Sequence, residues 1–464
     1  MRPSLVPALA VLVACADPAD DRAAFLIGQL SEDNWVWSQR EPGQVADKLR
    51  KMQRTAFDWM RGTTSVYWRD LTAPGAPWPT TTDLGDAAAA GVLLVGDPHP
   101  ENLGTFRASD GTIYVDWNDF DAAGYGPYWG DLWRLATAVV IAVGQPDEAS
   151  RRALADRVAR AYADEIRGLA TGTPATEITA AHPVLAELID DAREDGDELD
   201  KLDEYAPVRD DGRRELLLGD LEAPGPDGVP EDRLDPVGVE AARWVAEAVA
   251  RWRGSAQAPV SAAAATIKDM RRRVGAGVAS YPALRYYALL EGETTSLDDD
   301  LLLELKETRD GLRLDVPGYQ AAPWRSPGHR VVAAQRTIHA RADGDPLLGW
   351  ADLGALSFRV RDRTGYQRGL DAADLAELAA TGDAAALLDL ADVTGRLLAR
   401  AHARTTTRGG VSAIEVIEPL LFEREDTLAA EVTAFALAYA AQIEADHAAM
   451  SLLDLPALVL GGGR

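Results

Sequence analysis

The apolar positions of the chain recur mostly with helical spacing. Asp147–Leu169 has one apolar face, and the proline just before it suits the start of a helix. Helical patterns also cover Gln44–Arg61 and Val239–Arg253, and the chain beyond Leu370 is rich in Ala and Leu. A long helix near the end is predicted from a single apolar stripe, formed by Leu428, Val432, Phe435, Tyr439 and Ile443.

Shorter runs have the pattern of strands, and these are Val92–Val95, Arg285–Leu290 and Leu301–Lys306. A hairpin is predicted over Thr105–Val115, because a Ser-Asp-Gly turn separates two strand-like runs there. The segment Glu187–Asp235 is acidic, with Pro and Gly near its end, and is expected as a solvated loop or a pair of exposed helices at a boundary. Helices together with hairpin-forming strands indicate the α+β class.

Composition narrows the possible partners. The chain has 464 residues, and 74 acidic against 47 basic residues give it a net charge of -27, so a nucleic acid or an anionic membrane surface would be repelled. A single cysteine excludes a disulfide framework and a multi-cysteine zinc site. No apolar run reaches the roughly 18 residues that a membrane-spanning helix needs.

The amino terminus has the pattern of an export signal. A basic start precedes a short apolar stretch that ends at Ala14 and is followed by Cys15, the only cysteine. The Leu-Val-Ala-Cys sequence resembles the lipobox of bacterial lipoproteins, which implies removal of residues 1–14 and lipidation of Cys15. The protein would then be anchored in the cell envelope by lipid alone. A disordered start or a short buried segment is the alternative, and an unused signal would leave the protein cytoplasmic.

The chemically informative segment is Gly96–Gly104, with the sequence Gly-Asp-Pro-His-Pro-Glu-Asn-Leu-Gly, between a strand and the hairpin. The second hairpin strand then delivers Asp116 and, three residues later, Asp119. Phosphoryl transfer needs a carboxylate that orients the attacking hydroxyl, and an amide and a second carboxylate that hold Mg²⁺ on the phosphates. A loop followed by a hairpin can bring Asp97, Asn102 and such a carboxylate together in one site.

This pattern resembles the aminoglycoside and choline kinase branch of the protein-kinase-like superfamily, although Val95 replaces the leading histidine of that branch. The resemblance implies that Asp97 is the catalytic aspartate and that Asn102 and Asp116 bind the metal. Asp119, in the Asp-Phe-Asp sequence that ends at Asp121, is a rival for the second metal ligand, and the two readings stay open. Asp, Asn and Gly are also ordinary turn residues, so a purely structural loop is the alternative.

Short motifs in a fixed order extend over nearly the whole chain. They are Arg61–Thr63, Gly96–Gly104, Asn118–Asp121, Arg273–Gly277, Arg285–Tyr287, Leu305–Glu307, Arg330–Val332 with Gln335–Arg336, Leu398–His402, and Tyr439–Ala440 with Gln442 and Asp446. These motifs are similar to those of the bacterial domain-of-unknown-function 2252 family. That family name establishes no activity, so the function has to be argued from the site.

The segment from Gly275 to Lys306 resembles the small lobe of a kinase, where a Gly-rich loop covers the phosphates and a strand lysine pairs with them. By this resemblance Gly275, Gly277 and Lys306 would hold a nucleotide, ATP or another. The block follows the Asp97 motif instead of preceding it, which implies a circularly rearranged small lobe. An ordinary turn with a solvated lysine is the alternative. The acidic residue that this family has before Gln-Arg is Ala333 here, so the lysine would lack its usual partner.

A nucleotide's phosphates must touch both the lysine and the metal. The Lys306 amine is therefore expected within roughly 10 Å of the carboxylate of Asp116 or Asp119. The predicted organisation is a signal peptide (1–14), a tether (15–40) and one kinase-like domain (41–464), with catalytic motifs at 91–136, a small-lobe-like block at 270–345 and C-terminal helices at 370–450.

The expected fold is thus α+β and protein-kinase-like, with a mostly helical large lobe and a small β-rich lobe. The expected function is Mg²⁺-dependent phosphoryl or nucleotidyl transfer to a small-molecule or other hydroxyl-bearing substrate. Two alternatives remain, a non-catalytic, lipid-anchored binding module and a metal-dependent phosphoesterase. Nucleic acid is not expected as a partner, and the membrane is expected as one only through the lipid.

Overall fold

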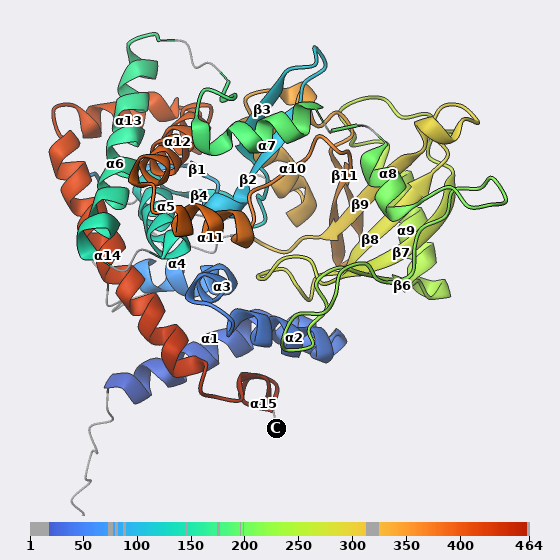
Figure 1. Cartoon of the computed structure of the whole chain (residues 1–464), viewed down its shortest axis with the longest axis horizontal. Helices are drawn as coiled ribbons and strands as arrows, with labels where there is room; N and C mark the ends of the chain where they lie inside the picture. Colours follow the sequence, from blue (N-terminus) through green and yellow to red (C-terminus); the bar gives the residue numbers. More distant parts are fainter. Residues whose placement is uncertain are drawn as a thin grey trace, which may run out of the picture.

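The computed structural model describes residues 18–72, 78, 82–86, 90–144, 147–173, 177–194, 196–197, 199–311 and 324–461. The predicted signal segment and Cys15 lie outside the described residues. The fold is α+β, as predicted. Figure 1 shows a mainly helical part on the left and a large sheet on the right.

The first helices differ from the sequence prediction in two ways. The expected tether is wrong from residue 18 onward, because that segment forms helix α1 (Pro18–Arg40), whose Leu26 and Leu30 are buried in the main core. The predicted helix Gln44–Arg61 is broken into α2 (Pro42–Met52) and α3 (Ala56–Gly62). The break occurs because the side chain of Thr55 caps α3 by accepting a hydrogen bond from Asp58 N at 3.0 Å. Helix α4 (Thr64–Thr72) follows directly.

Long helices build the core of the helical part. They are α5 (Tyr128–Val143), α6 (Glu148–Ala170), α12 (Ala384–Ala403) and α14 (Glu425–Met450). The predicted stripe of α14 is confirmed, since all five of its members are buried. Asp147 caps α6 by accepting from Ser150 N at 2.8 Å. Shorter helices surround this core, and these are α7 (Pro183–Glu194), α11 (Ala372–Thr381), α13 (Ala413–Leu421) and α15 (Leu455–Gly461).

Two small antiparallel pairs of strands lie within the helical part. The predicted hairpin is confirmed as β2 (Leu103–Arg107) paired with β3 (Ile113–Trp117). The predicted strand at Val92–Val95 is β1 (Gly91–Leu94), which pairs with β4 (Gly124–Pro127). The Asp97 loop therefore leaves one pair of strands and enters the other.

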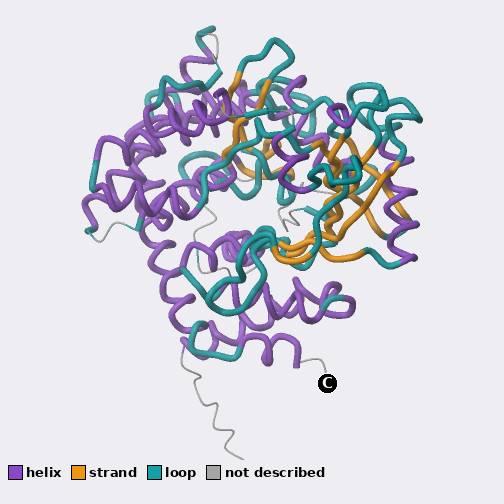
Figure 2. The backbone as a smooth tube through the Cα atoms, turned by 45° about the vertical axis from the view of Figure 1, so that its right-hand side comes forward, coloured by secondary structure: helices purple, strands orange, loops and turns teal. Residues whose placement is uncertain are grey.

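The large sheet has seven antiparallel strands in the order β10-β11-β9-β8-β7-β6-β5. Their bounds are β5 (Gly219–Asp220), β6 (Arg233–Pro236), β7 (Ile267–Val274), β8 (Arg285–Leu290), β9 (Leu301–Glu307), β10 (Gly349–Leu353) and β11 (Leu356–Asp362). Strands β8 and β9 were predicted, whereas the other five were not. Helix α10 (Pro327–Ile338) lies between β9 and β10 in the chain. Figure 2 shows the strands of this sheet gathered on one side of the molecule.

The two faces of the sheet differ in chemistry. Helix α9 (Val239–Trp252), predicted as Val239–Arg253, packs on one face against apolar side chains that include Leu303 and Leu305. On the other face the cross-strand row Arg285, Lys306 and Arg359 is charged. The segment expected as a loop or exposed helices forms α7, α8 (Asp200–Tyr205), β5 and β6, and α8 contributes to a small core on the charged face.

Candidate functional site

The Asp97 loop is held at its start by backbone hydrogen bonds to a buried acid. Asp131, near the start of α5, accepts from Val95 N at 2.8 Å and from Gly96 N at 3.1 Å. Gly96 has φ of +91°, and a Cβ there would lie 2.1 Å from Ala122 O. Only glycine therefore lets the loop pass so close to the segment that follows Asp119.

Asp131 is itself held in a buried polar network. His402 Nε2 lies 3.2 Å from its carboxylate, and His402 Nδ1 lies 2.8 Å from the Tyr162 hydroxyl. All three side chains are buried. This network fixes the anchor of the loop from helices α6 and α12, so His402 acts as a structural residue.

Asp97 projects from this loop against two partners. Arg134 Nε donates to Asp97 Oδ1 at 2.6 Å, and Thr64 Oγ1 donates to Asp97 Oδ2 at 2.9 Å. Burial raises the pKa of Asp97, while Arg134 and Thr64 lower it. The side chain is 15% exposed, so the carboxylate is oriented and still reachable. Asn102 lies beside it, because its Nδ2 donates to Asp97 O at 2.9 Å.

Lys306 joins the large sheet to the Asp-Phe-Asp segment. Its Nζ lies 3.1 Å from Asp119 Oδ2 and 2.6 Å from Asp121 Oδ2. The predicted proximity of Lys306 to Asp119 is therefore confirmed. Burial alone would raise the pKa of Asp119, but Lys306 and Arg359 hold that pKa well below its ordinary value. Asp119 is consequently a charged carboxylate at neutral pH.

Asp116 lies in a different set of contacts. Its carboxylate is fully buried and accepts from Ala340 N at 2.8 Å and from Arg404 Nη1 at 3.3 Å through Oδ2. Its Oδ1 accepts from Trp117 N at 2.9 Å. Both oxygens are thus engaged, and Oδ2 holds the hairpin to the segments after α10 and α12. Between the two candidates for the second metal ligand, the contact with Lys306 favours Asp119.

Arg330 on α10 holds the Asp-Phe-Asp segment from the other side. Its guanidinium donates to Ala123 O at 2.6 Å, to Asp121 O at 2.8 Å and to Arg309 O at 2.7 Å. Burial lowers the pKa of Arg330 to about 10. The sequence motif contained this arginine without indicating its role, since Ala123 O and Asp121 O lie 207 and 209 residues away in the chain.

The glycine turn lies between β7 and β8, at the end of the sheet where Arg285 pairs with Lys306. Gly275 has φ of +109°, and a Cβ there would lie 2.4 Å from Glu231 O. Lys51 Nζ donates to Gly275 O at 3.2 Å, and Gly277 has φ of +80°. Both glycines are thus required by the turn, which contacts α2 and the residues before β6.

His99 is buried close to Asp97 and is neutral. Burial lowers its pKa well below the ordinary value, and the cations of Arg61 and Arg134 add to this effect. Its ring packs edge-on against Phe57 with 5.6 Å between centroids, and within the described ranges its Nδ1 has no hydrogen-bond partner. These contacts fit a packing role.

Oxygen ligands for Mg²⁺ are few at the site. Among the described residues, no three His, Cys, Asp or Glu side chains come together as a metal-binding group. Asp119 supplies one anionic carboxylate, and the Asn102 amide oxygen could supply a second ligand. Mg²⁺ keeps several waters and needs only one or two carboxylates when it also binds substrate phosphates, so the small number of acids does not exclude a substrate-borne Mg²⁺.

A family model described as "Uncharacterized protein conserved in bacteria (DUF2252)" matches residues 40–451 of the chain. No curated protein and no solved structure matches it. Within the part of the chain that the structure describes, no helix is both long and apolar enough to cross a bilayer.

Proposed function

The chain belongs to this bacterial family of uncharacterised proteins, and from its site we propose that it is a Mg²⁺-dependent phosphotransferase, or a related nucleotidyl-group transferase, acting on a hydroxyl acceptor. The observation that carries the proposal is the contact of Lys306 with Asp119 across 187 residues of chain. In protein kinases, a strand lysine and a metal-binding aspartate act on the same phosphates. Here the two groups already meet at one point.

The order of elements around Lys306 supports a kinase-like small lobe. Strand β7, the glycine turn, β8 and β9 follow one another, β9 carries the lysine, and α10 is the next helix among the described residues. A kinase small lobe has a Gly-rich loop, a lysine on its third strand and then a helix. The acidic helix residue that pairs with that lysine in kinases has no counterpart at Ala333, and Asp119 and Asp121 pair with Lys306 instead.

Three side chains have distinct roles in this proposal. Asp119 and Asn102 would hold Mg²⁺, which neutralises charge on the transferred phosphoryl group when it is bound. Asp97 would accept a hydrogen bond from the acceptor hydroxyl, since a carboxylate has about four acceptor positions and Arg134 and Thr64 leave room for one more. The reaction would depend on positioning and on electrostatic stabilisation.

A thermal-shift screen of nucleotides with and without Mg²⁺ tests the proposal. A ligand at 100 times its dissociation constant stabilises a protein by about 2.7 kcal/mol. We expect stabilisation that needs both nucleotide and Mg²⁺ and that is lost in Asp119→Asn. Stabilisation by no nucleotide would support the non-catalytic binding module. Nucleotide hydrolysis that no hydroxyl acceptor accelerates would support the phosphoesterase.

A further inference from the structure

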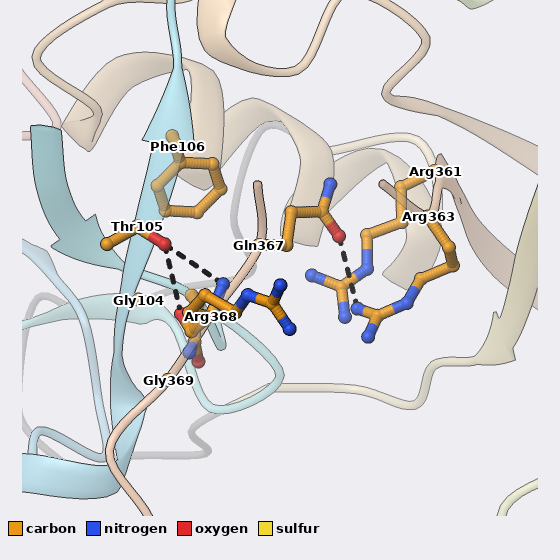
Figure 3. Close-up of a pocket in the computed structure, with 9 residues that line it drawn as sticks. Gly104, Thr105, Phe106, Arg361, Arg363, Gln367, Arg368 and Gly369 are labelled. Carbon is orange, nitrogen blue, oxygen red and sulfur yellow. Dashed lines mark hydrogen bonds between the residues drawn. The ribbon is translucent and has the colours of Figure 1, made fainter. Parts of the chain in front are cut away.

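A cavity of about 200 Å³ lies between the β2–β3 hairpin and the segment that follows β11. Figure 3 shows Arg361, Arg363 and Gln367 on one side of it, with Thr105 and Arg368 opposite. Asn118, which immediately precedes Asp119, completes the polar lining. The cavity thus adjoins the site already described without including Asp97, Asp119 or Lys306.

The neutral polar groups of this lining are already engaged within the protein. Thr105 Oγ1 donates to Tyr366 O at 2.7 Å and accepts from Arg368 N at 2.9 Å. Gln367 donates to Asp362 O and accepts from Arg363 Nη1, both at 3.1 Å. Asn118 Nδ2 donates to Leu103 O at 3.2 Å. The lining therefore offers few free acceptors to a ligand.

Guanidinium donors, in contrast, are in surplus. The Nε atoms of Arg363 and Arg368 are buried and have no acceptor among the described residues. Arg359, two residues before Arg361 on β11, is 2% exposed, and its Nε and Nη1 have no hydrogen-bond partner in the part of the chain that the structure describes. A buried donor without an acceptor is costly, so these groups favour a ligand that brings acceptors.

Several arginines gather around one buried acid beside the cavity. Glu304 Oε1 accepts from Arg359 at 2.9 Å and from Arg361 at 3.2 Å, and the same carboxylate lies 3.5 Å from Arg285 and from Arg273. Glu304 is thus shared by four arginines, of which Arg273 is also paired with Asp232 at 2.9 Å. In the lining itself, Arg368 is paired with Asp200 at 3.2 Å. Burial, together with the neighbouring Arg359, lowers the pKa of Arg361 to about 9. This cationic cluster stands out in a chain whose net charge is -27.

We propose that this cavity binds a phosphate-class oxyanion, either free phosphate or the phosphate group of a monoester. A guanidinium fork matches two oxygens of a phosphate, and a dianion can accept from several arginines at once. The volume suits a small anionic group better than a whole drug-sized ligand, for which pockets of about 300–1,000 Å³ are usual. The inference goes beyond the proposed transfer reaction, because it uses none of the residues assigned to it.

Calorimetry and thermal melts with sodium phosphate test this site, without Mg²⁺ or nucleotide and against sodium chloride of equal ionic strength. We expect phosphate, at about 100 times its dissociation constant, to raise the melting temperature by several degrees. Arg363→Gln and Arg368→Gln should each lose most of this shift. Arg251→Gln, a matched charge removal on the opposite face of the sheet, should keep it.

Further arms separate the possible outcomes. If Arg363→Gln does not fold, Arg368→Gln decides, because the Arg368 side chain is 31% exposed. Lys306→Met should keep the phosphate-induced shift in melting temperature. If Lys306→Met loses this shift while the arginine variants keep it, the anion binds at the transfer site and the proposal is overturned. A wild-type shift no larger than that of chloride would overturn it as well.

Tighter binding of glycerol phosphate than of inorganic phosphate would identify a monoester as the ligand, and the reverse would identify the free ion.

Discussion

Lys306 Nζ lies 3.1 Å from Asp119 Oδ2 while only 3% of the lysine side chain is exposed. Asp121 adds a second carboxylate at 2.6 Å. Both acids thus compensate the buried lysine, and Arg359 lies close enough to lower the pKa of Asp119 as well. When a nucleotide with its own Mg²⁺ binds, the lysine could exchange its contact with these carboxylates for a contact with the phosphates.

The first prediction concerns Asp97. Asp97→Asn should lower turnover by roughly 10²–10⁴-fold, because the amide cannot accept the proton of an acceptor hydroxyl. The fold should stay intact, because the amide oxygen still accepts from Arg134 or Thr64, but the melting temperature should fall, because buried Arg134 loses its charged partner. Asp147→Asn is the control, because asparagine caps α6 as well as aspartate does. Unchanged turnover with a lowered melting temperature would show that Asp97 is only structural.

The second prediction separates the two candidate metal ligands. Asp119→Asn should abolish Mg²⁺-dependent nucleotide binding, measured by calorimetry, with little loss of stability because Asp121 still pairs with Lys306. Asp116→Asn should leave binding intact and cost about 1–3 kcal/mol, because donors from Ala340 and Arg404 lose a charged acceptor. The opposite pattern would reassign the metal site to Asp116.

The third prediction compares two lysines of the same sheet. Lys306→Met should weaken nucleotide binding by roughly 10–100-fold, the range expected for loss of one charge-assisted contact. Lys268, on β7, also forms an ion pair with a buried acid, with its Nζ 2.9 Å from Asp300 Oδ1. Lys268→Met should lower stability without changing nucleotide affinity. Equal affinity in both variants would argue against a phosphate role for Lys306.

The fourth prediction concerns the pH dependence of folding stability. Lys48 on α2 is 4% exposed, its Nζ donates to Asn34 Oδ1 at 3.0 Å, and burial lowers its pKa from 10.5 to about 8. Between these two values the unfolded chain binds the proton and the folded chain does not, so the lysine makes stability rise with pH. Lys48→Met should remove this rise and add up to about 3 kcal/mol of stability at pH 7. Chemical denaturation of both proteins from pH 7 to 10.5 would measure it, and parallel curves would contradict it.

The fifth prediction concerns the amino terminus. Cys15 should carry a lipid and residues 1–14 should be absent from protein made in its own host, as the Leu-Val-Ala-Cys sequence implies. Mass spectrometry of the purified protein measures both changes, and Cys15→Ser should prevent the lipidation. An intact Met1 together with a free thiol would rule the modification out.

Local patterns carried much of the fold prediction. The β2–β3 hairpin followed from its turn residues, and the stripe of α14 followed from helical spacing. The contact of Lys306 with Asp119 could be predicted because phosphate chemistry requires a lysine and a metal ligand to meet. A chemical requirement of this kind predicts a long-range contact that local sequence patterns do not contain.

Other features depend on contacts that no local pattern contains. Strand β11 alternates apolar residues with Arg359 and Arg361, a pattern typical of an exposed face, but here the arginines point toward the helical part and surround Glu304. The choice between Asp116 and Asp119 was open for the same reason. Both follow strand residues, and only the folded structure pairs one with Lys306 and the other with Arg404.

The position of the lysine strand after the catalytic loop has a consequence for biosynthesis. A ribosome that adds about 5–20 residues per second completes Asp119 roughly 10–40 s before Lys306, since 187 residues separate them. Arg330, which binds the same segment, emerges later still. During that interval the nascent chain carries the acidic segment without its basic partners, so the site cannot form before about two thirds of the chain has been translated.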